Sequence, residues 1–103
     1  MSDVTVTDNP TEQRFEAHVD GALAGFAAYQ LTDELIVFTH TEVEPAFEGQ
    51  GIGSALARGA LDQVREQGSR SVLAVCPFIK GWMLRHEDYA DLLYDRATPP
   101  VAD

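Results

Sequence analysis

The sequence has a single cysteine, Cys76, and three histidines that lie far apart along the chain. A lone cysteine cannot form an intramolecular disulfide, and no cysteine or histidine pair has the spacing of a zinc site, so we expect neither disulfide nor metal. No stretch approaches the ~18 uninterrupted apolar residues of a membrane-spanning helix. The first residues also lack the basic-then-apolar layout of a secretory signal. These absences favour a cytoplasmic, reducing location.

Basic residues are also scarce, with seven Lys and Arg against seventeen Asp and Glu, and the formal net charge is −10. Such a chain repels the phosphate groups that a nucleic-acid binder must neutralise. We therefore expect no nucleic acid and no membrane among its partners. The 103 residues, 45% hydrophobic and 23% charged, are typical of one small globular domain.

Alternating apolar and polar residues predict three strands in the first half of the chain. Residues 1–11 are polar and rich in turn formers, so we expect a flexible segment there, with at most a short edge strand over 4–7. Asp20-Gly21 predicts a tight turn that joins the first two strands into a hairpin. The third strand begins apolar and ends polar, which is typical of burial at one end only. The strands are expected at residues 15–19, 22–31 and 35–43.

Helical periodicity predicts a different organisation after position 50, with a helix, a short buried strand, a second helix and a last helical turn. These elements are expected at residues 51–67, 71–76, 77–86 and 88–94, and Gly68 is expected to end the first helix. A strand-helix-strand unit favours a parallel pair, whereas the preceding hairpins are antiparallel. The predicted fold class is α/β with a mixed sheet, as a single compact domain over 12–96 followed by a loose tail over 97–103.

Three glycines spaced by two, Gly49, Gly51 and Gly53, lie at the junction of the third strand and the first helix. Neither a dinucleotide fingerprint nor a P-loop fits, because the required glycine, lysine and serine positions are not filled. Glycines let backbone N–H groups surround an anion, and the helix N-terminus adds partial positive charge at the same point. The segment is therefore either an anion cradle or a plain glycine-rich turn. As a cradle it would use Gly49, Gln50, Gly51, Ile52, Gly53 and Ser54.

Four segments together resemble the short N-acetyltransferases of the GNAT superfamily: His40–Val43, Gly49–Leu56, Cys76–Phe78 and Arg85–Tyr89. The resemblance extends over roughly residues 12–95. It implies acetyl-CoA as the acyl donor, with the pyrophosphate on a loop of pattern (Gln/Arg)-x-x-Gly-x-(Gly/Ala). Glu48 occupies the first position of that pattern here, and a carboxylate beside a diphosphate weakens binding unless it points outward.

The resemblance further implies that the pantetheine arm lies beside the strand that ends at Val43 and uses backbone groups of Thr41, Glu42 and Val43. A primary amine would attack the thioester directly, and a side chain would accept its proton. Glu42 is the first candidate and His40 the second, because residues two apart on a strand share a face. The alternative is that both are solvated residues at a strand end.

Cys76 ends the second strand of the parallel pair, where open α/β sheets place their ligand crevice. It is a buried apolar side chain, a contact of the CoA sulfur, or a nucleophile that becomes acylated, and these alternatives stay open. Many members of the superfamily place a tyrosine on the following helix to protonate the leaving thiolate. Here Phe78 and Trp82 occupy that helix, and Tyr89 comes later.

Aromatic and apolar side chains in both halves of the chain are expected in the core rather than around a cofactor. They are Phe15, Phe26, Phe38, Phe47, Phe78, Trp82 and Leu92. His86 is expected to cap the helix that it ends.

Two functions are compatible with these features. The first is an acetyl-CoA-dependent N-acetyltransferase whose acceptor is a small-molecule or protein amine. The second is a non-catalytic acyl-CoA-binding module that senses CoA or regulates a partner. Dispersed acidic charge favours a cationic acceptor, and the sequence leaves monomer and homodimer both open.

Overall fold

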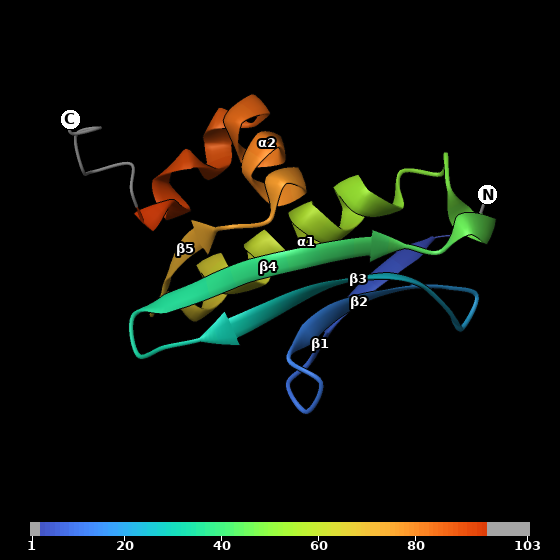
Figure 1. Ribbon diagram of the computed structural model, residues 1–103, viewed down its shortest axis with the longest axis horizontal. Coiled ribbons are helices and arrows are strands. Elements are labelled where there is room, and N and C mark those ends of the chain that lie inside the picture. Colours follow the sequence, from blue (N-terminus) through green and yellow to red (C-terminus); the bar gives the residue numbers. More distant parts are fainter. Residues whose placement is uncertain (1–2, 95–103) are drawn as a thin grey trace.

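The computed structural model describes residues 3–94, which form one mixed five-stranded sheet with helices on one side (Figure 1). The strands lie side by side in chain order: β1 (Val4–Asn9), β2 (Arg14–Val19), β3 (Ala22–Leu31), β4 (Leu35–Val43) and β5 (Ser71–Ala74). Neighbours run antiparallel from β1 to β4, and β5 runs parallel to β4. The predicted α/β fold class with a mixed sheet is confirmed.

The helices are α1 (Ile52–Gln67) and α2 (Pro77–Arg85), with short 3₁₀ turns η1 (Pro45–Phe47) and η2 (Glu87–Leu92). Both ends of α1 are set by glycines, as predicted, because Gly51 and Gly68 adopt left-handed backbone conformations that other residues rarely accept. No helix in residues 3–94 is long and apolar enough to cross a membrane.

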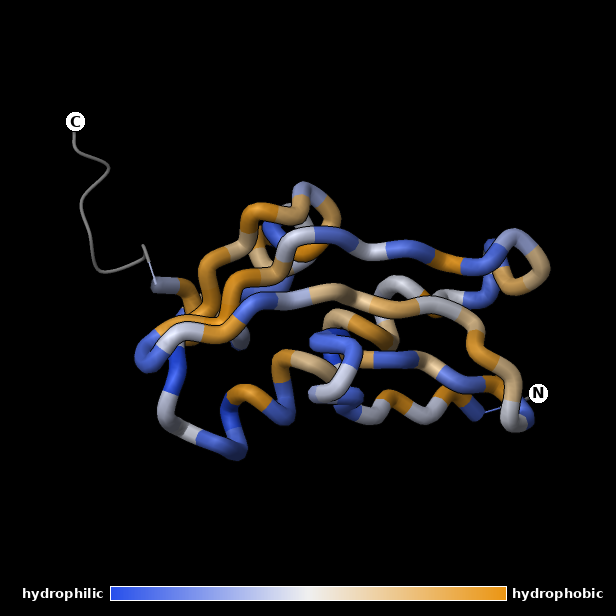
Figure 2. Tube along the Cα trace, turned by 60° about the horizontal axis from the view of Figure 1, so that its bottom comes forward, coloured by the Kyte–Doolittle hydropathy of each residue, from blue (hydrophilic) through white to orange (hydrophobic). Residues whose placement is uncertain are grey.

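The core lies between the sheet and the two α-helices. Every second residue of β2 is buried, which the alternation predicts, and α1 presents one apolar stripe to the strands. Figure 2 shows β4 changing from an apolar first half to a polar second half. The largest fully buried side chains are Trp82, Phe15, Phe38, Ile52, Leu56, Leu61, Ile79, Met83 and Val72.

The opposite side of the sheet, here called the outer face, has no helix over it in the part of the chain that the structure describes (Figure 1). Glu16, Phe26 and Glu42 are paired across β2, β3 and β4. Their positions alternate with buried neighbours, so they belong to the outer face. This open face is the second surface that β4 presents, besides the edge described below.

Some elements differ from the sequence-based expectation. The segment expected to be flexible forms a full six-residue edge strand, β1, whose Val4 and Val6 pack against the core. β5 ends at Ala74, two residues earlier than expected, and the last helical turn is a 3₁₀ turn. The expected tail over 97–103 lies outside the described residues.

The aromatic prediction was wrong for Phe26 and Phe78, whereas Phe47 packs against the core. Phe78 is 39% exposed, and Phe26 and Phe47 are half-buried. Phe26 lies on the outer face, where the Arg14 guanidinium stacks 4.7 Å above its ring. The exposure of Phe26 could not be predicted from its hydrophobicity. In a strand, side chains alternate between the two faces of the sheet, so the position of the residue in the strand determines which face it lies on.

Candidate functional site

β4 and β5 separate halfway along β4. Their pairing ends at Phe38 and Ala74, where the Phe38 carbonyl oxygen accepts hydrogen bonds from the N–H groups of both Val75 (3.0 Å) and Cys76 (2.8 Å). Beyond this point β4 continues to Val43 alongside β3, while the chain after β5 turns into α2. Within residues 3–94, no strand pairs with the far half of this edge of β4.

The backbone groups on that edge belong to Thr41 and Val43. In an antiparallel ladder, hydrogen-bonded and non-hydrogen-bonded pairs alternate. The N–H of Glu44 donates to the Ala24 carbonyl oxygen (2.8 Å), so the groups of Glu44 point toward β3. The N–H and C=O groups of Val43 and Thr41 therefore point away from β3, into the gap where β5 has ended.

A β-bulge places the side chains of His40 and Glu42 on the outer face. Phe38 pairs with Tyr29 and His40 pairs with Ala28, so Thr39 is the extra residue. A regular strand would put Phe38 and His40 on one face, yet Phe38 is buried and His40 is exposed. His40 Nε2 lies 2.7 Å from Glu42 Oε2, and the two side chains are 58% and 59% exposed.

The loop of residues 48–51, here called the glycine loop, leads into α1, whose N-terminus has no side-chain cap. Gly49 (φ +83°) and Gly51 (φ +77°) both adopt left-handed conformations. At this end of α1, the Ala55 N–H donates to the Gly51 carbonyl oxygen (3.0 Å). The preceding N–H groups in the first turn have no partner within the helix. They form a site suited to a diphosphate.

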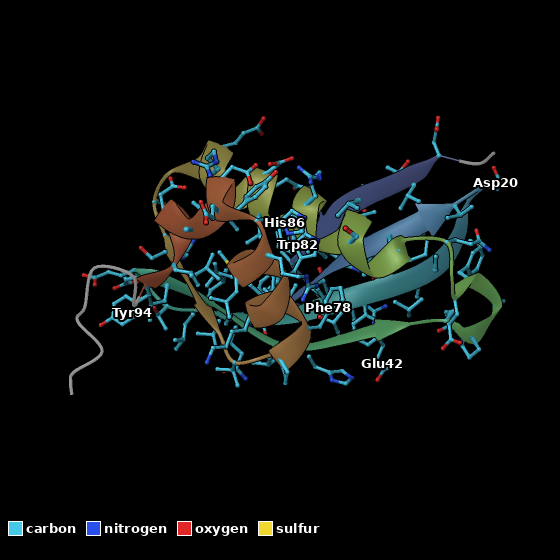
Figure 3. The ribbon with its side chains drawn as sticks, turned by 90° about the horizontal axis from the view of Figure 1, so that it is seen from above. Asp20, Glu42, Phe78, Trp82, His86 and Tyr94 are labelled. Atoms are coloured by element: carbon cyan, nitrogen blue, oxygen red, sulfur yellow. The ribbon has the colours of Figure 1, made fainter. Side chains whose placement is uncertain are left out.

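A cavity of about 520 Å³ opens between this loop and α2. Gly53 lies so close to the Phe78 ring that an added Cβ would be 2.8 Å from its Cζ. Figure 3 shows Phe78, Trp82 and His86 following one another along α2, with Phe78 nearest to Glu42. The lining residues are Val43, Phe47, Glu48, Gly49, Gly51, Ile52, Gly53, Ser54, Phe78, Trp82, Arg85 and His86.

Trp82 fixes α2 against α1. Its indole Nε1 donates to Ser54 Oγ (2.9 Å), and its ring is only 1% exposed. His86 stacks on it with ring centroids 3.8 Å apart and planes 10° from parallel. Its Nδ1 lies 2.7 Å from the Trp82 carbonyl oxygen, which only accepts, so Nδ1 carries the hydrogen. His86 thus both caps α2, as expected, and contributes to the cavity wall.

The structure places most of the predicted cradle together. Val43, Gly49, Gly51, Ile52, Gly53 and Ser54 all line the cavity, whereas Gln50 is exposed and is not among the lining residues. Glu48 is exposed at the rim. Cys76 is buried at 3% exposure, and its Sγ lies 3.2 Å from Thr41 Oγ1, beside the gap between β4 and β5.

The proton-transfer candidates do not all reach this gap. The Tyr89 hydroxyl donates to Asp62 Oδ1 (2.6 Å), and this hydrogen bond, with burial, raises the pKa of Tyr89. The hydroxyl is thereby bonded to α1 at Asp62, and Tyr89 is not among the residues that line the cavity. No group of residues in the described ranges could hold a metal ion.

The contribution of Phe78, Trp82 and His86 to the cavity wall was not predicted, because Phe78 and Trp82 were assigned to the core and His86 to a helix cap. Phe78, Trp82, Arg85 and His86 follow the i, i+4, i+7, i+8 spacing of one helix face, and this spacing was the signal that α2 presents a surface to the glycine loop. The buried Gly25 was missed as well. An isolated glycine inside a strand pattern indicates a close backbone approach, which here is that of the Glu42 carbonyl.

Comparison with known proteins agrees with this geometry. The family model "GCN5-related N-acetyl-transferase" matches residues 14–92. The solution structure of a GCN5-like protein from Staphylococcus aureus superposes with a TM-score of 0.66 at 24% identity, covering 90% of each chain. The ribosomal-protein-S18-alanine N-acetyltransferase of Escherichia coli gives a TM-score of 0.57 at 16% identity, over 72% of this chain and 66% of that chain. These two likenesses concern the fold.

A curated relative adds sequence similarity. Streptothricin acetyltransferase from Streptomyces lavendulae is 44% identical over 52 residues, which make up 48% of this chain and 28% of the relative. The chain thus matches little more than a quarter of that relative's length. The family model, in contrast, spans most of the described residues, including β2 to β5, the glycine loop and both α-helices. This chain belongs to the GCN5-related N-acetyltransferase family.

Proposed function

We propose that this protein transfers an acetyl group from acetyl-CoA to a primary amine. The observation that carries the proposal is the separation of β4 from β5 directly beside an uncapped helix N-terminus. An extended arm that ends in a diphosphate needs both features, a free strand edge and a cradle of N–H groups. Membership of the family supports acyl transfer as the reaction.

The residues present fit acetyl-CoA in this arrangement. The N–H groups at the start of α1 would hold the diphosphate, and the cavity beside them has room for the groups attached to it. The amide groups of the pantetheine arm would pair with Thr41 and Val43. Glu48 would lie at the rim, where water screens its charge. The acetyl thioester would then reach the gap between β4 and β5.

The proposed reaction is a direct attack of the amine nitrogen on the thioester carbonyl carbon. A backbone N–H of β4 would donate to the carbonyl oxygen as it gains negative charge, and such a donor is worth about 3 kcal/mol. The C–N bond forms, the C–S bond breaks, and CoA leaves as a thiolate that takes a proton from solvent. The amine's proton would pass to Glu42 or His40, which are within hydrogen-bond distance of each other.

The acceptor would approach from the outer face. His40 and Glu42 project there, and the acidic Glu16 and Glu42 lie on either side of Phe26 across the strands. The Arg14 guanidinium already covers the Phe26 ring and pairs with Glu16, so the exposed Glu42 carboxylate and the net charge of −10 are the features that favour a cationic amine, such as a lysine side chain or a polyamine. The uncovered face would admit an amine carried by a larger molecule.

The test combines binding and turnover. Calorimetry should show saturable acetyl-CoA binding that Gly51→Glu abolishes, because a carboxylate would enter the cradle. A panel of amines and basic peptides should then reveal transfer, and Glu42→Gln should lower kcat about 100-fold or more. If the protein binds acetyl-CoA but transfers the acetyl group to no amine, the proposed catalytic activity is refuted and a non-catalytic acyl-CoA-binding module remains. Absence of binding to the wild type would refute both.

A further inference from the structure

The cavity extends beyond the glycine cradle to the C-terminal end of α2. Phe78 contacts Gly53, Trp82 reaches Ser54, and Arg85 and His86 line the wall one turn further on, about 5 Å along the helix. In Figure 3, His86 lies at the opposite end of this row from Glu42. These α2 side chains therefore extend from the gap between β4 and β5, at Phe78, to the far end of the cavity, at Arg85 and His86.

Arg85 differs from the other arginines in residues 3–94. Four of them are hydrogen-bonded within the protein: Arg14 to Glu16, Arg58 to Tyr89, Arg65 to Asp91 and Arg70 to Thr32. Arg85 has no such bond and no ion pair within that range, although the chain carries a net charge of −10. A guanidinium without a carboxylate partner is available to an anionic ligand.

Gly81 makes room for this guanidinium. An added Cβ at Gly81 would lie 3.4 Å from Arg85 Nη1, so the side chain folds back along α2 over the glycine. The stacked rings of Trp82 and His86 line the same cavity as Arg85. Arg85 is exposed to solvent and lines the cavity, so its guanidinium is accessible to a ligand that binds there.

We propose that Arg85 binds the 3′-phosphate of coenzyme A and so selects CoA thioesters over thioesters that lack this group. The inference rests on the proposed function. With the thioester at β4 and the diphosphate at the start of α1, the next part of the molecule is the adenosine, whose 3′-phosphate is one ribose ring away from the diphosphate. That part of the ligand falls at the end of the cavity that Arg85 lines. A dianionic phosphate matches the planar fork of a guanidinium.

The test compares acetyl-CoA with acetyl-3′-dephospho-CoA by calorimetry. A charge-assisted contact predicts that the wild type binds acetyl-CoA about 10- to 100-fold more tightly. Arg85→Gln should weaken acetyl-CoA binding by this factor and leave the affinity for the dephospho compound unchanged. Arg85→Lys should restore part of the preference, because it returns the charge without the fork.

Lys80→Gln is the matched control. It removes one positive charge from the same helix, but Lys80 lines a separate hollow with Leu84 and Leu93, so the preference should persist. Equal affinity of the wild type for both thioesters would overturn the inference while leaving the proposed function intact. Equal weakening of both by Arg85→Gln would also overturn it, since Arg85 would then act on the diphosphate. Binding of neither thioester to the wild type would overturn the proposed function as well.

Discussion

Gly25 allows β3 to approach β4 at the edge that we assign to the thioester. A Cβ at this position would lie 2.6 Å from the Glu42 carbonyl oxygen, 3.2 Å from Ile52 Cγ2 and 3.3 Å from Val43 Cα. Two of these neighbours are backbone atoms, which cannot rotate away as a side chain can. In Gly25→Ala, β4 must therefore move relative to β3 at Glu42 and Val43.

The expected loss of stability follows from two opposing effects. Overpacking a buried site costs typically about 1–3 kcal/mol. Alanine recovers roughly 0.5–1 kcal/mol, because it loses less conformational entropy than glycine on folding. The midpoints of these ranges give a net loss of about 1 kcal/mol, with an upper bound of about 2.5 kcal/mol, and a domain of this size loses about 4–8 °C in Tm per kcal/mol. Urea and thermal unfolding measure both values.

The same substitution should also lower kcat/KM for acetyl transfer, because the N–H of Val43 moves with the strand. Gly81→Ala is the control for stability. Its nearest neighbour is the mobile end of the Arg85 side chain, and a glycine in a helix interior gains up to about 1 kcal/mol on replacement by alanine. A Gly25→Ala protein with unchanged Tm and unchanged kcat/KM would refute the close approach.

Three further substitutions test other parts of the structure. Cys76→Ala should lower kcat less than about tenfold if the amine attacks directly, and an acetyl adduct on Cys76 in mass spectra would contradict this. Gly59→Ala should destabilise the fold by about 1–3 kcal/mol in urea, because its Cβ would lie 2.7 Å from Val6 Cβ; unchanged stability would mean that β1 is not packed on α1. The hydrogen bond from Arg14 lowers the pKa of Glu16 below its ordinary 4.5, so the carboxylate stabilises the fold above that pH and this contribution is lost as the pH falls through the folded pKa. Glu16→Gln should therefore flatten the acid side of the stability profile, and an identical profile would contradict the pairing.

Features that depend on a few adjacent residues were predicted correctly from the sequence. The alternation in β2, the turn at Asp20-Gly21, and the glycines at both ends of α1 are all confirmed, since each follows from the backbone preferences of a few adjacent residues. The parallel pairing of β4 and β5 followed from the helix between them.

Features that depend on distant contacts were not predictable in this way. β1 is short and polar, and part of its stabilisation comes from far along the chain, where Val6 packs on Gly59 and its carbonyl accepts a hydrogen bond from Gln63. Phe78 resembles a core residue in sequence. It is instead 39% exposed and lies close to Gly53 of α1, and this position depends on how α2 packs on α1.

Several expectations have not been tested by the structure. The cytoplasmic location, the exclusion of nucleic acid and membranes as partners, and the choice between monomer and homodimer stay predictions. So do the roles of the individual site residues, and the binding and turnover measurements above address these roles directly.

The bulge at Thr39 explains how a single strand can contribute to two surfaces. Sequence spacing alone predicts that His40 and Glu42 share a face, which their 2.7 Å contact confirms, but it cannot predict which face, because one extra residue reverses the parity of everything after it. With the bulge, the side chains of these two residues point to the outer face, while the backbone groups of the alternating Thr41 and Val43 point into the gap left by β5. Cofactor and acceptor would therefore meet across β4 from different directions, because the side chains of His40 and Glu42 and the backbone groups of Thr41 and Val43 alternate along four consecutive residues.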